Sequence, residues 1–212
     1  MGWLLILVCC VLASRQLSSA LVNSPVRCVG LQLGMTKMSA ERTGVDLKAS
    51  EDIQINVKLL NGIDEVSRES WNSLVTDSHP FLLYDWIHAL EASGCASAGE
   101  GWQPLHIIVE QLTKENTTSL VAAMPMYAKS HSYGEFIFDQ SWADFAQRVV
   151  GIKYYPKLLA AVPFTPATGS RLMLSTSLTD SQADGIAMAV TTFMKNLMSS
   201  NKLSGAHANF LP

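Results

Sequence analysis

Regular alternation of hydrophobic and polar residues begins only after residue 50. The run IQINVKLL, which starts at Ile53, predicts a strand that ends at the turn signal Asn61-Gly62. Asp64 is then placed to cap a short helix. A second helix is predicted to begin after His79-Pro80 and to end at Gly94. Its apolar stripe consists of Leu82, Leu83, Trp86, Ile87 and Leu90.

Three strand-like runs come next, at residues 105–110, 119–128 and 135–139, and they predict an antiparallel meander. A short helix is expected over residues 142–149. Residues 154–171 are punctuated by prolines and predict irregular loops, and they are followed by a short apolar run at 172–174.

The strongest helical pattern lies near the end of the chain, where Ser181 and Asp184 resemble a capping box and Gly205 marks the end. The residues at helical spacing are Ile186, Val190, Phe193, Met194, Leu197 and Met198. Residues 206–211 could begin another strand, and the chain looks cut short there. Strands and helices alternate, so we expect a mixed α/β (α+β) fold.

The amino end has the features of a targeting segment. Residues 3–13 are uniformly apolar, too short for a span of about 20 residues but suited to the core of a signal peptide. Ser18 and Ala20 supply small side chains before a cleavage site, so residues 1–20 are predicted to be a signal peptide. No stable membrane span is expected after processing.

Residues 21–50 resemble a transit peptide, because no Asp or Glu precedes Glu41 while Arg27, Lys37 and Arg42 are basic. A signal peptide followed by such a segment is typical of a bipartite presequence that directs a protein into a complex plastid. The alternatives are a secreted precursor with a flexible start and an uncleaved anchor.

Composition excludes several classes of protein. The chain has 15 Lys and Arg against 18 Asp and Glu, which disfavours a DNA- or RNA-binding protein. Two of the four cysteines, Cys9 and Cys10, lie in the apolar run, so a disulfide scaffold is excluded. The sequence contains no HxxxH, HxH or CxxC pattern, no G-x-S-x-G and no phosphate-binding glycine motif, so neither a metal site nor a serine nucleophile is expected.

The charge is unevenly distributed along the chain. Residues 41–144 hold sixteen acids and six bases, whereas residues 145–179 hold no acid. The four bases of this second stretch are Arg148, Lys153, Lys157 and Arg171. These bases could receive an anionic ligand, or they could be solvated surface residues that balance an acidic neighbour.

Candidate chemistry is densest in residues 129–144, KSHSYGEFIFDQSWAD. A regular strand there would place Glu135 and Asp139 in one line, and partial burial would suit one of them to act as a general base. The alternative is structural: Asp139 and Asp144 would cap the following helix, while His131 and Tyr133 would be turn residues.

Three long segments, residues 79–110, 122–144 and 154–173, carry a family resemblance, most clearly in K-S-H-S-Y-G-E and V-P-F-T-P-A-T-G-S-R-L. The chain resembles the amino-terminal half of the FemAB-like family, associated with peptidoglycan biosynthesis or recognition, in the GNAT acyltransferase superfamily. This resemblance implies a GNAT-like domain over residues 51–212, with a largely antiparallel sheet flanked by helices and truncated after its fifth strand.

The resemblance implies transfer of an acyl or aminoacyl group to an amine-bearing acceptor. Acyl-CoA or aminoacyl-tRNA would be the co-substrate, with no tightly bound cofactor. The expected base is Glu135, with His131 as the second candidate; Lys157 and Arg171 would contact an anion, and Trp102, Trp142 and Tyr155 would form pocket walls. The full set of expected substrate-binding residues is Lys129, Tyr133, Asp139, Trp142, Asp144, Tyr155, Lys157, Thr168 and Arg171.

Members of the family normally continue into a second half, and nothing in this chain corresponds to it. The chain is therefore expected either to need a second FemAB-like half for catalysis or to be a non-catalytic module that recognises a ligand or peptidoglycan. A third alternative is a fragment without independent function.

Overall fold

A computed structural model describes residues 54–212, apart from residues 77–78, 113–116, 134 and 136–137. The predictions of a signal peptide and a transit segment within residues 1–50 lie outside the described residues. The described part contains two open sheets of four strands each, flanked by helices, which confirms the predicted mixed α+β fold class.

The first sheet has the strand order β1-β3-β4-β7 and is antiparallel throughout. Its strands are β1 (Ile55–Leu60), β3 (His106–Leu112), β4 (Thr118–Met124) and β7 (Met173–Leu174). The second sheet has the order β2-β5-β6-β8, in which only the β6-β8 pair is parallel. Its strands are β2 (Trp102–Pro104), β5 (Met126–Lys129), β6 (Lys157–Ala160) and β8 (Ala206–Ala208).

One long hairpin connects the two sheets. β2 leads directly into β3 through Leu105, and β4 leads into β5 through Pro125. The Leu105 amide still donates to the Met126 carbonyl across the junction, at 2.9 Å. Proline has no amide hydrogen to donate to a ladder, so strand pairing is interrupted at Pro125 and the hairpin changes sheet there. The single strand expected over residues 119–128 is therefore two strands.

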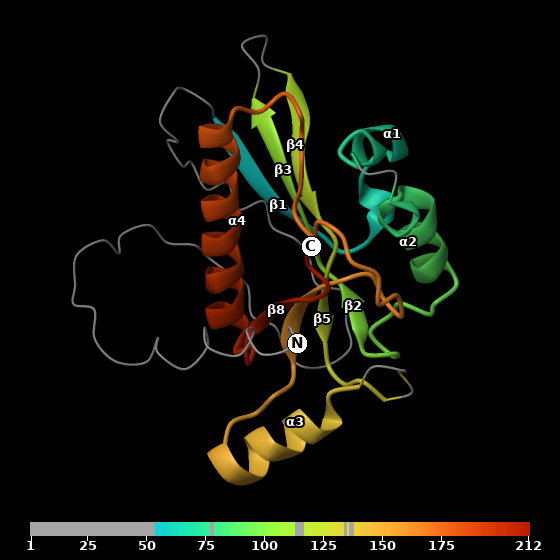
Figure 1. Cartoon of the computed structure of the whole chain (residues 1–212), viewed down its shortest axis with the longest axis vertical. Helices are drawn as coiled ribbons and strands as arrows, with labels where there is room; N and C mark the ends of the chain where they lie inside the picture. Colours follow the sequence, from blue (N-terminus) through green and yellow to red (C-terminus); the bar gives the residue numbers. More distant parts are fainter. Residues whose placement is uncertain (1–53, 77–78, 113–116, 134, 136–137) are drawn as a thin grey trace, which may run out of the picture.

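Helices cover both faces of the first sheet (Figure 1). The long helix α4 (Asp180–Asn201) packs on one face through Ile186, Ala189 and Val190. The opposite face is covered by shorter elements around the buried Trp71. These elements are η1 (Ile63–Glu65), α1 (Arg68–Asn72), η2 (Pro80–Leu82) and α2 (Tyr84–Ala92).

Another helical segment extends away from the sheets (Figure 1). It consists of α3 (Gln140–Phe145) and the π-helical turn η3 (Ala146–Val150) that continues it. It agrees with the helix expected over residues 142–149. The following stretch differs from its prediction, because residues 157–160 form the buried central strand β6 rather than a loop. Four consecutive buried residues give no alternating pattern, so the strand is not visible as a period of two.

Two predicted helix caps are wrong. Ser67, not Asp64, caps α1, because the Ser67 hydroxyl accepts the Ser70 amide at the first helical turn. The capping box of α4 is formed by Thr179 at the N-cap and Gln182 at the third helical position, rather than by Ser181 and Asp184. Gln at the third helical position reaches back to the Thr179 amide, which satisfies the same donors that the predicted pair would have satisfied.

A buried polar cluster lies where the hairpin changes sheet. The Met126 amide donates to His106 Nδ1 at 3.2 Å, so the proton of the neutral His106 ring is on Nε2. That nitrogen lies 2.7 Å from Glu91 Oε1, which also accepts from the Tyr127 hydroxyl at 3.2 Å. The other oxygen of Glu91 accepts the Ile63 amide at 2.8 Å. One carboxylate on α2 therefore joins both sheets and the turn after β1.

Candidate functional site

The candidate site lies on the face of the second sheet that α4 leaves free. The α4 side of this sheet carries Met126, Leu158 and Ala160, which belong to the main core. Alternation along the strands therefore turns Lys129 and Lys157 to the opposite face. Trp102, Lys129 and Lys157 lie in register across β2, β5 and β6, so they form one row.

Lys129 is buried and fully engaged. Its ammonium group donates to Glu135 and to the His131 carbonyl, and it lies 4.2 Å from the centre of the Trp102 ring. The Trp102 indole nitrogen donates to the same Glu135 oxygen, Oε1, at 3.1 Å. Glu135 is thus held in place by a cation and by an indole, while its Oε2 atom has no hydrogen-bond partner among the described residues.

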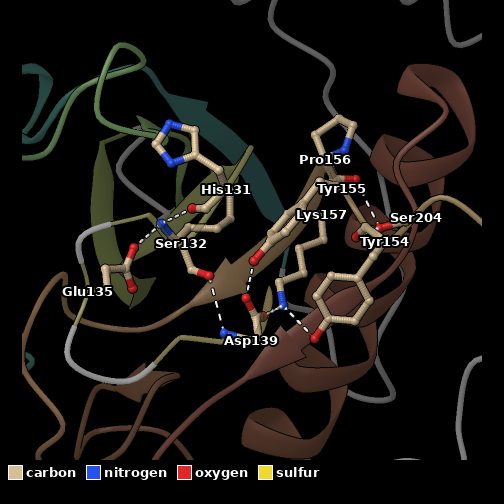
Figure 2. A network of polar contacts seen from close by, with 10 residues as sticks. His131, Ser132, Glu135, Asp139, Tyr154, Tyr155, Pro156, Lys157 and Ser204 are labelled. Atoms are coloured by element: carbon tan, nitrogen blue, oxygen red, sulfur yellow. Dashed lines mark hydrogen bonds and ion pairs between the residues drawn. The ribbon is translucent and has the colours of Figure 1, made fainter. Parts of the chain in front are cut away.

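Lys157 makes the second ion pair of the site (Figure 2). Its ammonium group donates to Asp139 Oδ2 and to the Tyr154 hydroxyl, the latter at 3.0 Å. The Tyr155 hydroxyl donates to the other oxygen of Asp139. Ser132 completes the cluster by accepting the Asp139 amide at 3.2 Å, which holds the backbone beside the carboxylate.

Burial and hydrogen bonding shift several pKa values in the site. Burial alone would raise the pKa of Asp139, but hydrogen bonds from Lys157 and Tyr155 hold it at about 2. Burial lowers the pKa of Lys157 and of Lys129, against the attraction of their carboxylate partners. Burial and the nearby charge of Asp139 raise the pKa of Tyr154, and burial with the hydrogen bond to Asp139 raises that of Tyr155. Asp139 is therefore a firmly ionised structural anion, poorly suited to accept a proton near neutral pH.

The prediction that Glu135 and Asp139 lie in line on one strand is wrong. Of residues 135–139, the described Glu135, Phe138 and Asp139 belong to no strand, while residues 136–137 lie outside the description. The carboxylates instead point to different lysines, which stand on neighbouring strands.

His131 lies beside the Lys129–Glu135 pair, and its ring stacks on Tyr133 at 5.1 Å between ring centres. The ring also covers Gly101, where a β-carbon would come within 2.9 Å of His131 Cε1. His131 Nδ1 is buried and has no partner among the described residues. The imidazole is thus close to the site, but only its backbone carbonyl contacts the ion pair.

Other predicted site residues lie apart from this cluster. Arg171 is 1% exposed and donates to the backbone carbonyls of Ala167, Asn209 and Phe210, so it joins a loop to the segment after β8. Thr168 is exposed, and its carbonyl accepts from His79. Trp142 and Asp144 are exposed on α3. Their roles in binding a substrate stay predictions.

Ser204 and His207 lie near the site, although no pattern in the sequence marked them as candidates. The Ser204 hydroxyl donates to the Tyr154 and Pro156 carbonyls (Figure 2). The His207 ring on β8 lies 6.0 Å from the Tyr154 ring, and burial followed by the charge of Lys157 lowers its pKa. About fifty residues separate these from Tyr154, and only the parallel β6-β8 pairing brings them together.

Among the described residues, no group of three or more His, Cys, Asp or Glu side chains is arranged to hold a metal ion. Nor does any helix in that part of the chain combine the length and apolarity needed to cross a bilayer.

The sheets, with a long helix on one face and short helices on the other, are consistent with the α/β architecture of the GNAT class. Residues 62–212 match the FemAB-like family, described as peptidoglycan biosynthesis/recognition, and the chain belongs to that family. Comparisons with curated proteins and with solved structures gave no match.

Proposed function

We propose that the protein transfers an acyl or aminoacyl group to the amine of a peptidoglycan-related acceptor, with Glu135 as the general base. The amine nitrogen attacks the carbonyl carbon of the donor, a C–N bond forms, and the C–O bond of an aminoacyl ester or the C–S bond of a thioester breaks. Glu135 accepts the proton from the attacking amine, and this proton is then passed to the departing oxygen or sulfur. One bond forms, one bond breaks and the proton ends on the leaving group, so the transfer involves no change of oxidation state.

The supporting observation is the asymmetry of the Glu135 carboxylate. Lys129 and Trp102 both donate to Oε1, which fixes the orientation of the group, whereas Oε2 has no partner among the described residues. A base needs one such open oxygen within hydrogen-bond reach of the proton that it accepts. Asp139 does not offer this, since both of its oxygens are engaged and its pKa is about 2.

The remaining residues of the site have supporting roles in this proposal. Lys157, Tyr155 and Asp139 hold the wall of the site opposite Glu135, and Tyr133 with His131 lines its edge. Acyl-CoA or aminoacyl-tRNA would supply the acyl group, and a second FemAB-like half would complete the donor site.

A non-catalytic recognition module is the second candidate, and the charge balance of the site favours it. Each buried lysine is neutralised by its own carboxylate, Lys129 by Glu135 and Lys157 by Asp139. Such a preformed cluster can present fixed donors and acceptors to a ligand without any proton transfer.

The test uses the full chain and its variants, each expressed in the cells of origin and purified, and offers them acetyl-CoA or aminoacyl-tRNA together with an amine-bearing peptidoglycan stem peptide. The product is detected as a mass increase of the acceptor. Glu135→Gln keeps the shape of the side chain but removes its basicity, and we expect turnover to fall by about 100-fold or more. Glu100→Gln, an exposed change near Gly101, is the matched control and should leave turnover unchanged.

Thermal unfolding of each variant separates catalysis from folding. Glu135→Gln also removes the anion that pairs with the buried Lys129, so its melting temperature is expected to fall, and turnover is compared at a temperature at which both proteins are fully folded. Lost turnover in the folded variant supports Glu135 as the base. Product formation that survives Glu135→Gln contradicts the assignment, and acceptor binding without any product supports the recognition module instead.

A further inference from the structure

The segment 140–153, here named the helical excursion, leaves the body of the molecule and returns to it at a single place. It begins directly after Asp139 and ends before Tyr154 and Tyr155. The Tyr155 hydroxyl donates to Asp139, so the two ends are fastened to each other by a hydrogen bond of the candidate site. Between those ends, α3 and η3 extend away from the sheets (Figure 1).

The excursion exposes large apolar side chains. Trp142 is 55% exposed, Phe145 53% and Val149 67%, and Val150 and Ile152 are about half exposed as well. Trp142, Phe145 and Val149 are spaced three and four residues apart, so they lie along one side of the helical turn. Ala143 is the only residue of α3 that is buried. The apolar side chains of the excursion therefore face outward, and only Ala143 faces the interior.

The charge of the excursion differs from that of the rest of the molecule. Its exposed bases are Arg148 and Lys153, and its one acid, Asp144, lies 3.9 Å from Arg148. By contrast, residues 41–139 hold fifteen acids and six bases, while residues 154–212 hold two acids and four bases. Outside the excursion, residues 41–212 therefore carry seventeen acids and ten bases, so an anionic surface repels that part on balance and attracts the exposed bases of the excursion.

We propose that the helical excursion docks on an anionic lipid surface, with Trp142, Phe145 and Val149 inserted at the level of the head groups and Arg148 and Lys153 contacting lipid phosphates. Short amphipathic helices with aromatic residues on one side and Lys or Arg beside them bind membranes in this way. Tryptophan is favoured at the boundary between head groups and acyl chains. Docking through the excursion brings the Lys157–Asp139 pair close to the lipid surface, because that pair lies at its base.

A second copy of the chain is a poorer fit to the same surface. Stable protein interfaces use about 800 Å² on each partner with a packed apolar centre. The excursion is a projection that exposes only a few large apolar side chains, from Trp142 to Ile152, and these form no packed apolar centre. A lipid surface needs no complementary shape and accepts such a projection.

The test is quenching of tryptophan fluorescence by brominated lipids, using the full chain with vesicles of phosphatidylcholine alone or mixed equally with phosphatidylglycerol. Three proteins are compared: wild type, Trp142→Phe and Trp86→Phe. Trp86 is a partly exposed tryptophan on α2, outside the excursion, and serves as the matched control. The difference between wild type and Trp142→Phe reports Trp142, and the difference between wild type and Trp86→Phe reports Trp86.

We expect the anionic vesicles to quench wild type and Trp86→Phe by the same additional amount, which Trp142→Phe lacks. The double change Arg148→Glu and Lys153→Glu should weaken this quenching about tenfold or more in lipid concentration, since each basic residue contributes about 1 kcal/mol at an anionic surface. Equal quenching in Trp142→Phe and wild type would overturn the proposal. It would also be overturned by a Trp142 signal that depends on protein concentration without vesicles and accompanies a dimer in light scattering.

Discussion

Lys129 and Lys157 lie directly opposite each other on β5 and β6, and both side chains share the sheet face that α4 leaves free. Two like charges at paired positions of an antiparallel ladder destabilise a sheet unless each is compensated. Here the 130–139 segment supplies one carboxylate to each lysine. Repulsion between the two lysines destabilises the sheet, and the two carboxylates offset that repulsion. Removing one carboxylate and measuring stability therefore tests the arrangement.

The Asp139 carboxylate is expected to stabilise the folded state. Asp139→Asn leaves the buried Lys157 without its anion, and we expect a loss of about 2 kcal/mol in the free energy of unfolding at neutral pH. Urea denaturation measures this loss. The control is Asp144→Asn, which removes the exposed carboxylate 3.9 Å from Arg148 and should change stability by about 0.5 kcal/mol or less. Equal effects of the two changes would contradict the compensating role of Asp139.

The pH dependence of stability follows from the same carboxylate. Because the folded protein holds the pKa of Asp139 at about 2, below the unfolded value of about 3.9, its contribution is fully present above the unfolded pKa. It is lost as the pH falls through that value toward 2. Stability curves of wild type and Asp139→Asn should therefore converge on acidification across this window. Parallel curves would show that Asp139 titrates normally.

Gly101 is expected to tolerate no side chain because of His131. Its φ of +76° already disfavours other residues, and a β-carbon would lie 2.9 Å from the His131 ring. Gly94 has a similar φ of +79° with no atom within 4 Å of the added carbon, so Gly94→Ala measures the backbone strain alone, about 1 kcal/mol. Gly101→Ala should cost more in thermal denaturation. Adding His131→Ala should recover that excess, and failure to recover it would place the clash elsewhere.

Glu91 is expected to be the most sensitive polar residue of the interior. Glu91→Ala leaves the Ile63 amide, the His106 ring and the Tyr127 hydroxyl without their acceptor. We expect a loss of about 3 kcal/mol or more, since stranded buried donors keep their full desolvation cost. The comparison is Glu110→Ala, which removes the ion-pair partner of the partly exposed Lys58 on the first sheet. This change should lower the free energy of unfolding by about 1 kcal/mol or less. Chemical denaturation measures both.

Residues 1–50 are expected to direct the protein into a complex plastid. The measurement is the destination of a fluorescent reporter fused to this segment, alongside a fusion of residues 1–20 alone. We expect the longer fusion to reach the plastid and the shorter one to remain in the secretory route. Secretion of both fusions would favour the ordinary secreted precursor.

The residues of the candidate site could be found from the sequence because most of them lie close together along it. Lys129 is the last residue of β5, and His131, Glu135 and Asp139 all lie between it and the start of α3 at Gln140. Their pairing could not be predicted, because it depends on the register of β5 against β6. Reading that register requires knowing that β6 exists, and its four buried residues show no alternation.

Local patterns predicted the helices better than the strands. The periodicity of α4 extends over many turns, so an error of two residues in its cap left the helix unchanged. The strand predicted over residues 119–128 was wrong at Pro125, where the chain continues in the same direction but in another sheet. A change of partner leaves little trace in hydrophobic pattern, because residues on both sides of Pro125 are buried.

The hairpin that runs through Leu105 and Pro125 also bears on how the molecule unfolds. One arm of the hairpin is β2 followed by β3, and the other is β4 followed by β5, so the hairpin supplies two strands to each sheet. Separation of the two arms would therefore break strand pairing in both sheets. Backbone amides of β3 and β5 should exchange their hydrogens with solvent in one cooperative event, although they belong to different sheets.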